Sequence, residues 1–324
     1  MIYVLYDKPK NEEDMSFVAA ELNYEYIELY PSERCNTNKK VFDFSKTSYK
    51  QLRNGDMVIC WYDFMAVIIW WLSRLTHKDI QVLALNILLK DKNTLKNKAA
   101  KFLYACALKS KTFYATVTTK AYGSRIKAML KINKDLYVLR DPYHSSYVMK
   151  SSIEEDYIFC GGRNGRDWKL ITEIAKELPN VEFIFCMSEE DSHEYINGCP
   201  KNISIKSDIC YEDFMEILSH SKIVALPLDT WAPAGLTVVF QAIANNKLVL
   251  ISKTVSTEEY FSATPNLMCS SKQEWEEKIT YYLMNDSERK DQAIMLKDSI
   301  ETMCSEENYG ITVNNIVTDT MKAK

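Results

Sequence analysis

Two arginines stand three residues apart in a glycine-rich segment, CGGRNGRDW at residues 160–168. An apolar run precedes it and a stretch with helical periodicity follows it, so the pattern predicts a strand, a tight turn and a helix. Glycines let a backbone approach a ligand closely, and the free N–H groups of a helix N-terminus attract anions. The guanidinium groups of Arg163 and Arg166 can add charge-assisted hydrogen bonds to phosphate oxygens. We therefore predict a phosphate-binding turn with two exposed arginines and with Asp167 as the helix cap. The alternative is a pair of solvated arginines.

A second segment, LPLDTWAPAGLTVVFQA at residues 226–242, also leads from a strand into a helix, which we expect to begin near Ala234. Glycine in the first turn of a helix costs about 1 kcal/mol relative to alanine, which is tolerated where a ligand must approach the backbone. We expect the N–H groups of Gly235, Leu236 and Thr237 to receive a diphosphate, with help from the Thr237 hydroxyl.

Gln241 lies one helical turn beyond Thr237 and could reach a ribose hydroxyl. The alternative for both residues is the ordinary polar side of a half-buried helix.

The rest of the chain alternates short apolar runs with helical stretches, which predicts parallel sheets covered on both faces. Ligands of such sheets bind beyond the carboxyl ends of the strands, so the loops after Cys160, Cys186 and Leu226 are the places to search. We expect strands at 2–6, 26–29, 57–60, 80–85, 113–117, 136–139, 157–160, 181–186, 203–205, 222–226 and 248–252, and helices at 14–22, 64–75, 94–108, 120–131, 167–178, 211–220 and 235–244.

The length of 324 residues suits two domains, and residues 140–152, which hold an Asp-Pro step and two serine pairs, suit a boundary. Hydrophobic residues make up 47% and charged residues 26%, the balance of a protein with a sizeable core. The formal net charge of -4 argues against bulk nucleic-acid binding. The longest apolar run, residues 64–72, is too short to span a bilayer.

Several kinds of chemistry find no support in the sequence. The four histidines have no metal-ligand spacing, no acidic pair suggests a metal site, and we expect none. Neither a P-loop nor a GxGxxG or GxSxG motif is present. The nine cysteines suggest reduced thiols, and the first fifteen residues do not resemble a secretory signal, so we expect a cytoplasmic protein.

The second half of the chain resembles the bacterial retaining glycosyltransferases of group 1, which are family 4-like and have the GT-B fold. Four segments carry the resemblance in order: 157–168, 181–186, 214–226 and the stretch AGLTVVFQAIANNKLV at 234–249. The resemblance implies an α/β protein with two Rossmann-like doubly wound domains facing a cleft. Residues 1–142 would bind the acceptor, residues 143–304 the nucleotide sugar, and residues 305–324 would cross back to the first domain.

The resemblance also implies a hexosyltransferase that moves a sugar from a nucleoside diphosphate of the UDP or GDP type, without metal and with retention. Its acceptor would be a glycan or a lipid-diphosphate-linked sugar, as in polysaccharide biosynthesis. Arg163 and Arg166 would stabilise the leaving diphosphate. The expected donor-binding residues are Gly161, Gly162, Arg163, Arg166, Met187, Ile209, Ala234, Gly235, Leu236, Thr237 and Gln241.

One departure from the family concerns a pair of glutamates that its members usually have eight residues apart. Pro233 and Gln241 occupy these positions here. The departure leaves two alternatives open: a non-catalytic GT-B-like protein that binds nucleotide or glycan or acts as a scaffold, and a nucleotide-sugar epimerase.

In the first half, Asp63 follows a strand and could bind or deprotonate an acceptor hydroxyl, or else cap the helix expected from residue 64. Residues 90–134 form a basic stretch with interleaved aromatic residues and one acid, Asp91. We expect it to contact an anionic membrane surface at the inner face of the cell membrane, the alternative being a solvated helix face. Its basic residues are Lys90, Lys92, Lys96, Lys98, Lys101, Lys109, Lys111, Lys120, Arg125, Lys127, Lys131 and Lys134.

Overall fold

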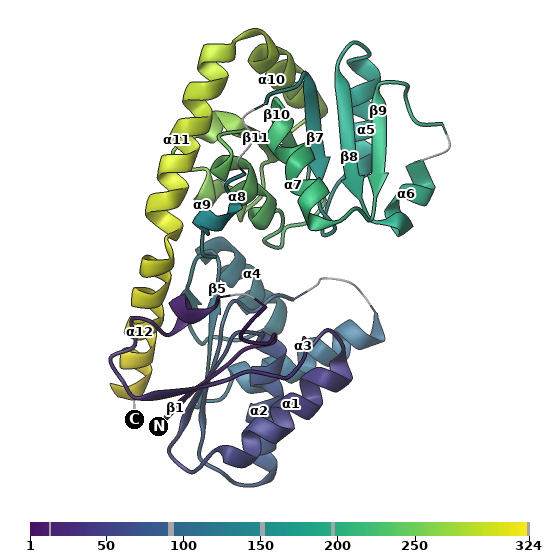
Figure 1. Cartoon of the computed structure of the whole chain (residues 1–324). Helices are drawn as coiled ribbons and strands as arrows, with labels where there is room; N and C mark the ends of the chain where they lie inside the picture. The colour runs from purple at the N-terminus through teal and green to yellow at the C-terminus, as the bar shows by residue number, and fades with distance from the viewer. Residues whose placement is uncertain (13, 90–93, 150–152, 196–197, 323–324) are drawn as a thin grey trace. The chain divides into compact units, whose positions relative to one another are not determined.

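The computed structural model describes residues 1–12, 14–89, 94–149, 153–195 and 198–322 (Figure 1). The chain divides into two units: unit 1 is Met1–Pro142 with Cys304–Lys324, and unit 2 is Tyr143–Met303. Each unit contains a six-stranded sheet, and the strand pairs are parallel. The prediction of two Rossmann-like α/β sheets is therefore confirmed.

The sheet of unit 1 has the order β2-β1-β3-β4-β5-β6. Its strands are β1 (Ile2–Leu5), β2 (Tyr26–Leu29), β3 (Met57–Cys60), β4 (Gln81–Ala84), β5 (Phe113–Val117) and β6 (Tyr137–Val138). Its helices are η1 (Ser16–Val18), α1 (Asn38–Gln51), α2 (Asp63–Leu75), α3 (Leu95–Leu108), α4 (Lys120–Leu130) and α12 (Glu306–Lys322).

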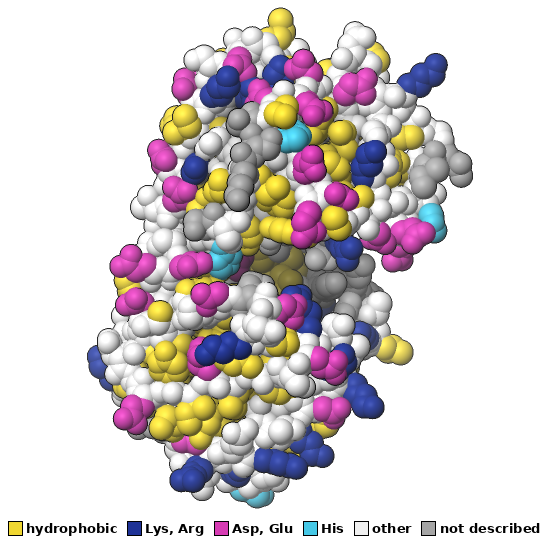
Figure 2. Space-filling view, viewed as in Figure 1, with side chains coloured by type: hydrophobic (Ala, Val, Ile, Leu, Met, Phe, Trp, Pro, Cys, Tyr) yellow, Lys and Arg dark blue, Asp and Glu magenta, His cyan; other side chains and the backbone are white. Residues whose placement is uncertain are grey.

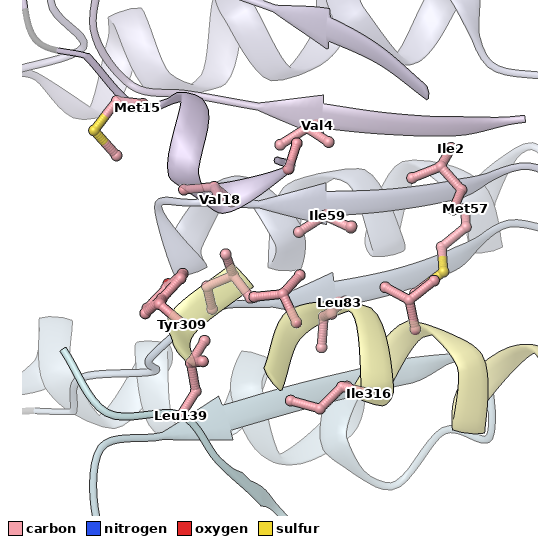
Figure 3. Packing of buried hydrophobic residues seen from close by; sticks show 14 of the residues in the cluster. Ile2, Val4, Met15, Val18, Met57, Ile59, Leu83, Leu139, Tyr309 and Ile316 are labelled. Atoms are coloured by element: carbon pink, nitrogen blue, oxygen red, sulfur yellow. The ribbon is translucent and has the colours of Figure 1, made fainter. Parts of the chain in front are cut away.

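The alternating side chains of the central strands in unit 1 belong to two faces of the sheet. Ile2 of β1 pairs with Met57 of β3, and both contribute to one buried cluster. Tyr309 and Ile316 of α12 join the same cluster, and Figure 3 shows them over this face of the sheet. The last helix therefore completes the core of unit 1, although most of that core comes from residues before 142.

The close approach of α12 to the 3-10 helix η1 depends on a glycine. A Cβ atom added to Gly310 would lie 2.9 Å from the backbone oxygen of Phe17 and 2.9 Å from Cγ of Glu21. The backbone oxygen cannot turn aside as a side chain can. Gly310 thus sets how closely the C-terminal helix packs.

The sheet of unit 2 has the order β12-β11-β10-β7-β8-β9. Strands β8 and β9 follow β7 on one side of it, and β10, β11 and β12 follow on its other side. This is the Rossmann strand order. The strands are β7 (Tyr157–Gly161), β8 (Glu182–Met187), β9 (Ile203–Ser207), β10 (Ile223–Leu226), β11 (Leu248–Ser252) and β12 (Met268–Cys269).

The helices of unit 2 cover a sheet whose central strands β7, β10 and β11 are buried along their whole length. The helix at 168–177 buries Trp168, Ile171, Ile174 and Ala175, which lie at helical spacing on one face. The helices are η2 (Ser145–Tyr147), α5 (Trp168–Glu177), α6 (Glu189–Tyr195), α7 (Tyr211–His220), α8 (Leu236–Ala244), α9 (Thr257–Tyr260), η3 (Pro265–Leu267), α10 (Lys272–Met284) and α11 (Asp286–Cys304).

Some local predictions differ from the structure. The helix expected at 14–22 is only the short η1, because Asp14 accepts a hydrogen bond from Ser16 N–H at 2.9 Å and Phe17 and Val18 turn into the core. Helix α1 was not predicted because its sequence, NKKVFDFSKTSYKQ, holds few apolar residues. Within the described residues, no helix has both the length and the apolar character needed to cross a membrane.

Substitution of Gly310 by alanine should destabilise unit 1. Alanine is more favourable than glycine inside a helix by about 1 kcal/mol, but overpacking against a fixed backbone costs about 1–3 kcal/mol. Urea unfolding should therefore show a net loss for Gly310→Ala. The control is Asn315→Ala on the exposed side of α12, which should keep or slightly raise the stability. Equal midpoints for the two variants would contradict the close packing of α12 on η1.

Candidate functional site

The candidate site lies at the carboxyl ends of β7 and β10, which are neighbours in the centre of the unit 2 sheet. The strand order reverses between them, because β8 and β9 lie beyond β7 whereas β11 and β12 lie beyond β10. Loops that leave two such strands separate to opposite faces and leave a crevice for a ligand. Both glycine-containing segments singled out by their sequence begin here.

Backbone hydrogen bonds join the two loops. The N–H of Asp167 donates to Pro227 O at 3.0 Å, and the N–H of Asp229 donates to Gly165 O at 3.1 Å. The ladder is short and antiparallel, and it holds the β7 loop against the β10 loop as one structure. Asp167 also caps α5, as predicted, by accepting from Leu170 N–H at 2.9 Å.

Two glycines of the β7 loop have backbone conformations that other residues rarely adopt, with φ of 120° at Gly162 and 63° at Gly165. A Cβ atom on Gly165 would overlap Cγ2 of Thr230 in the other loop. A Cβ atom on Gly162 would overlap the guanidinium group of Arg166. The glycines therefore allow the loops to pair and make room for an arginine beneath them.

Arg166 is the most constrained residue of the site, because only 7% of its surface is exposed. Its Nε donates to Gly161 O at 2.7 Å and its Nη1 donates to Asn164 O at 3.0 Å. Among the described residues, Nη2 has no hydrogen-bond partner and no carboxylate forms an ion pair with the group. Burial lowers the pKa of the Arg166 guanidinium, and the nearby Cys160 and Asp229 oppose that shift.

The position of Arg166 corrects the prediction of two exposed arginines. An exposed guanidinium would be surrounded by water, whereas Arg166 points back under its own loop and binds the carbonyl oxygens of the turn. Buried charges are normally paired, so a buried cation without a carboxylate marks a place where an anionic ligand is favoured.

The start of α8 lies beside this guanidinium. A Cβ atom on Gly235 would be 3.4 Å from Nη1 and 3.7 Å from Nη2 of Arg166. Gly235 is the N-cap with φ of 81°, and no side chain caps the helix. The first N–H groups of α8, including those of Leu236 and the exposed Thr237, therefore add their partial positive charge to that of the arginine.

Arg163 is placed differently from Arg166. Its side chain is 73% exposed and its Nη2 lies 3.2 Å from Oδ1 of Asp208, just beyond β9. The N–H of Asp208 in turn donates to Met187 O at 3.1 Å. Arg163, the buried Met187 and the half-buried Ile209 thus belong to the side of the loop toward β8 and β9. Asp208 was not among the predicted site residues, and its position after an exposed strand gave no signal.

Gln241 is buried in the second turn of α8. Its Oε1 atom is enclosed and has no hydrogen-bond partner among the described residues. A buried acceptor without a donor costs stability unless a ligand supplies one. Pro233 and Ala234 are half-buried in the loop before α8.

Asp63 belongs to unit 1 and is the first residue of α2, not its cap. Its Oδ2 accepts from Leu88 N–H at 3.0 Å, and Tyr104 also hydrogen-bonds to the carboxylate. Burial raises the pKa of Asp63 to about 6, against the opposing effect of these bonds. The carboxylate therefore anchors the loop that follows β4.

One further polar group contributes to the site without having been predicted. The Ser252 hydroxyl at the end of β11 accepts from Leu228 N–H at 2.8 Å and so supports the β10 loop.

Within the described part of the chain, histidines, cysteines and carboxylates form no cluster of three or more suited to a metal ion.

Comparison with known proteins gives a consistent result. Residues 163–309 match the family model described as glycosyl transferase-like. No curated protein matches the chain. Anabaena HepE, solved with UDP, is 13% identical over all of both chains, with a TM-score of 0.68.

Two other solved structures have the same architecture. A variant of S. aureus TarM, solved with fondaparinux, alpha-GlcNAc-glycerol and UDP, is 14% identical over 85% of this chain, with a TM-score of 0.63. The match covers 58% of that TarM chain. AviGT4, involved in avilamycin A biosynthesis, is 10% identical over 100% of this chain and 98% of its own, with a TM-score of 0.60. The fold is therefore GT-B, as expected.

Substitution of Gly165 by alanine should disturb the pairing of the loops. The left-handed conformation costs a non-glycine residue about 1–2 kcal/mol, and the overlap with Thr230 adds to that cost. Gly198→Ala is the matched control, because Gly198 has φ of 90° but nothing within 4 Å of its Cβ position. Thermal unfolding should show the larger loss for Gly165→Ala.

Thr230→Ser should restore part of that loss, because it removes Cγ2 and keeps the hydroxyl that accepts from Ala232 N–H at 3.2 Å. Equal losses at the two glycines, or no rescue by Thr230→Ser, would show that the Gly165–Thr230 contact is unimportant.

Proposed function

We propose that the chain is a glycosyltransferase that moves a sugar from a nucleoside diphosphate bound by unit 2 to a hydroxyl group of a glycan or lipid-linked acceptor. The observation that carries the proposal is the buried Arg166 guanidinium, which has no carboxylate partner in the described part of the chain and adjoins an uncapped helix N-terminus. The match to the glycosyl transferase-like family over the same region supports it.

The diphosphate of the donor would lie between Arg166 Nη2 and the first N–H groups of α8. Negative charge grows on the leaving diphosphate as the glycosidic bond breaks, and donors already held in place stabilise it without reorganisation. The Thr237 hydroxyl would assist, and Arg163 would exchange or share its contact with Asp208 to reach the outer phosphate. Because these groups supply positive charge at the leaving group, we propose a metal-independent transfer. Retention of configuration is proposed on the family resemblance alone.

The nucleoside would extend from the diphosphate along the same edge of the sheet. The unpartnered Gln241 Oε1 is a fitting acceptor for a ribose hydroxyl. Met187 and Ile209 would contact the base on the side of β8 and β9. HepE and TarM were solved with UDP, so UDP is the nucleoside diphosphate, and uracil the base, that we propose first.

A binding protein without catalysis is the second candidate. Pro233 and Gln241 replace a glutamate pair that the resembling family usually has, so the sugar loses carboxylate partners. Incubation with labelled UDP-hexoses and GDP-hexoses separates the possibilities. A transferred label supports the proposal, an epimerised donor indicates an epimerase, and saturable binding without turnover indicates a binding protein.

Unit 1 would receive the acceptor. Within it, we propose that Asp63 acts by holding the loop after β4 through Leu88 N–H rather than by touching the acceptor hydroxyl. An acceptor linked to a lipid diphosphate would bring the chain to an anionic membrane, and the basic stretch at 90–134 is suited to such a surface. Lys90, Asp91 and Lys92 of that stretch lie outside the described residues.

Activity should persist in excess chelator, because arginine and helix N–H groups neutralise the leaving diphosphate. The measurement is transfer of label with a saturating chelator, then with magnesium or manganese restored. Rates within about twofold of each other agree with the proposal. A rate that disappears with the chelator and returns with the metal would overturn this leaving-group mechanism.

Replacement of the cationic groups should weaken binding of the nucleoside diphosphate more than that of the nucleoside. Charge-assisted hydrogen bonds contribute about 1.5–3 kcal/mol, so Arg166→Lys, which lacks the planar fork, should weaken diphosphate binding by about tenfold or more. Arg163→Ala should have a smaller effect, because Arg163 is exposed and paired with Asp208. Thr237→Val should have the smallest, since the backbone N–H groups remain.

Calorimetry with nucleoside diphosphate and with nucleoside measures these differences. Lys201→Ala, at an exposed lysine of unit 2 outside the site, is the control and should bind both ligands like the parent. A folded Arg166→Lys protein with unchanged diphosphate affinity would place the donor site elsewhere.

A further inference from the structure

Helix α3 of unit 1 carries apolar side chains on two opposite faces. Tyr104 and Leu108 lie on its buried face. Leu95, Ala99 and Phe102 follow one another at helical spacing on the opposite face, and all three are exposed. The exposed fractions are 86% for Leu95 and 64% for Phe102, which are large for such side chains.

The charges around this apolar face have one sign. Lys98 and Lys109 lie along one side of it and Lys96 along the other, at 100° per residue, and all three are exposed. None of the three has an ion-pair partner among the described residues. We call the six residues Leu95, Lys96, Lys98, Ala99, Phe102 and Lys109 the α3 face.

The basic character extends beyond α3. Residues 94–134 contain ten lysines and arginines and no aspartate or glutamate, in a chain whose formal net charge is -4. Helix α4, which contacts α3, contributes Lys120, Arg125 and Lys127, of which Lys127 forms an ion pair with Asp135 at 2.6 Å. Figure 2 shows hydrophobic and basic side chains, with some acidic ones among them, over the part of unit 1 where Figure 1 labels α3.

An ordinary surface helix turns its charged side to water and its apolar side to the core. On α3, the side farthest from the core is apolar and the lysines flank it. This is the arrangement of a helix that lies in a membrane interface, with apolar side chains in the acyl boundary and lysines reaching lipid phosphates. An acidic protein partner could meet the charges, but would not explain why apolar side chains lie between them.

We propose that the α3 face docks unit 1 on an anionic lipid bilayer, with Leu95, Ala99 and Phe102 inserted and Lys96, Lys98 and Lys109 against the headgroups. This proposal rests on the membrane contact given under the proposed function and makes it specific. It names helix α3 as the contacting element, and it adds insertion of apolar side chains to charge attraction. It does not depend on sugar transfer, because vesicle binding is measured without nucleotide and donor binding without vesicles. Each can fail alone.

Insertion and charge attraction differ in their response to salt. Attraction between exposed charges and a surface falls as salt shortens the screening length to about 3 Å at 1 M. Apolar insertion does not weaken with salt. The parent chain should therefore bind anionic vesicles tightly at low salt and keep a measurable residual affinity at high salt, while neutral vesicles bind it weakly at both.

The first experiment is co-sedimentation of the full chain with vesicles of phosphatidylglycerol and phosphatidylcholine, or of phosphatidylcholine alone. Leu95→Ser with Phe102→Ser should lower the affinity for anionic vesicles by at least about tenfold and abolish the residual binding at high salt. The control pair is Met284→Ser with Ile294→Ser, at residues 79% and 50% exposed on unit 2, which should bind like the parent.

The second experiment tests the charges. Lys96→Gln, Lys98→Gln and Lys109→Gln together should lower low-salt binding by about a hundredfold, since each near-surface lysine contributes substantially to the attraction. The matched control is Lys39→Gln, Lys46→Gln and Lys50→Gln, at three exposed lysines of α1. Equal losses for the two triple variants would show that total charge, not the α3 face, governs binding.

The depth of insertion of the α3 face is measured with the variant Phe102→Trp. The tryptophan emission of this variant, after subtraction of the parent's emission, should shift to the blue on anionic vesicles. Lipids brominated on the acyl chain should quench it. Binding that is lost at high salt, without shift or quenching, would overturn insertion. Absence of binding to anionic vesicles would overturn the docking surface altogether. All substituted positions are exposed, so unchanged thermal unfolding confirms that each variant is folded.

Discussion

The candidate site depends on the hydrogen bonds that Arg166 donates to Gly161 O and Asn164 O. A buried guanidinium is costly unless hydrogen bonds replace those it made with water. Two of its three nitrogens bind carbonyl oxygens of their own turn, and these bonds hold the β7 loop in a closed curve. The third nitrogen is left available at the end of the strand, beside α8. The same side chain thus shapes the loop and provides its positive charge.

The glycines and the uncapped helix follow from that arrangement. Gly162 leaves the space that the guanidinium fills, and Gly235 takes the left-handed conformation in which α8 begins beside it. A serine or aspartate cap would satisfy the first N–H groups of α8 and would compete with a ligand for them. The absence of a side-chain cap at Gly235 costs stability but keeps these groups accessible. The N-terminus of α8 is therefore less stable than a capped one, but its free N–H groups favour an anionic ligand.

The sequence predicted the frame of the molecule better than the details of the site. Several strands, such as 113–117 and 248–252, have their predicted bounds, because buried parallel strands are unbroken apolar runs. The burial of Arg166 was not predictable, because it depends on carbonyl directions that arise only when the β7 and β10 loops pair. The contact between Arg163 and Asp208 joins residues 45 positions apart and had no local signal. Helix α1 lacks a clear apolar stripe, so only tertiary packing reveals it.

Neutral groups at two positions alter the electrostatics around the buried arginine. A carboxylate at residue 241 would stand on the same helix whose N-terminus adjoins Arg166, and would draw the positive potential away from the ligand. Gln241 keeps an oxygen acceptor without a charge, and Pro233 supplies no acceptor side chain at all. Asp229 remains near Arg166 but is exposed, so water screens it. Among the described residues, the buried charge at the carboxyl ends of β7 and β10 is that of Arg166, which would favour the diphosphate of the donor proposed above over its uncharged parts. The sugar of that donor would then be recognised through backbone groups.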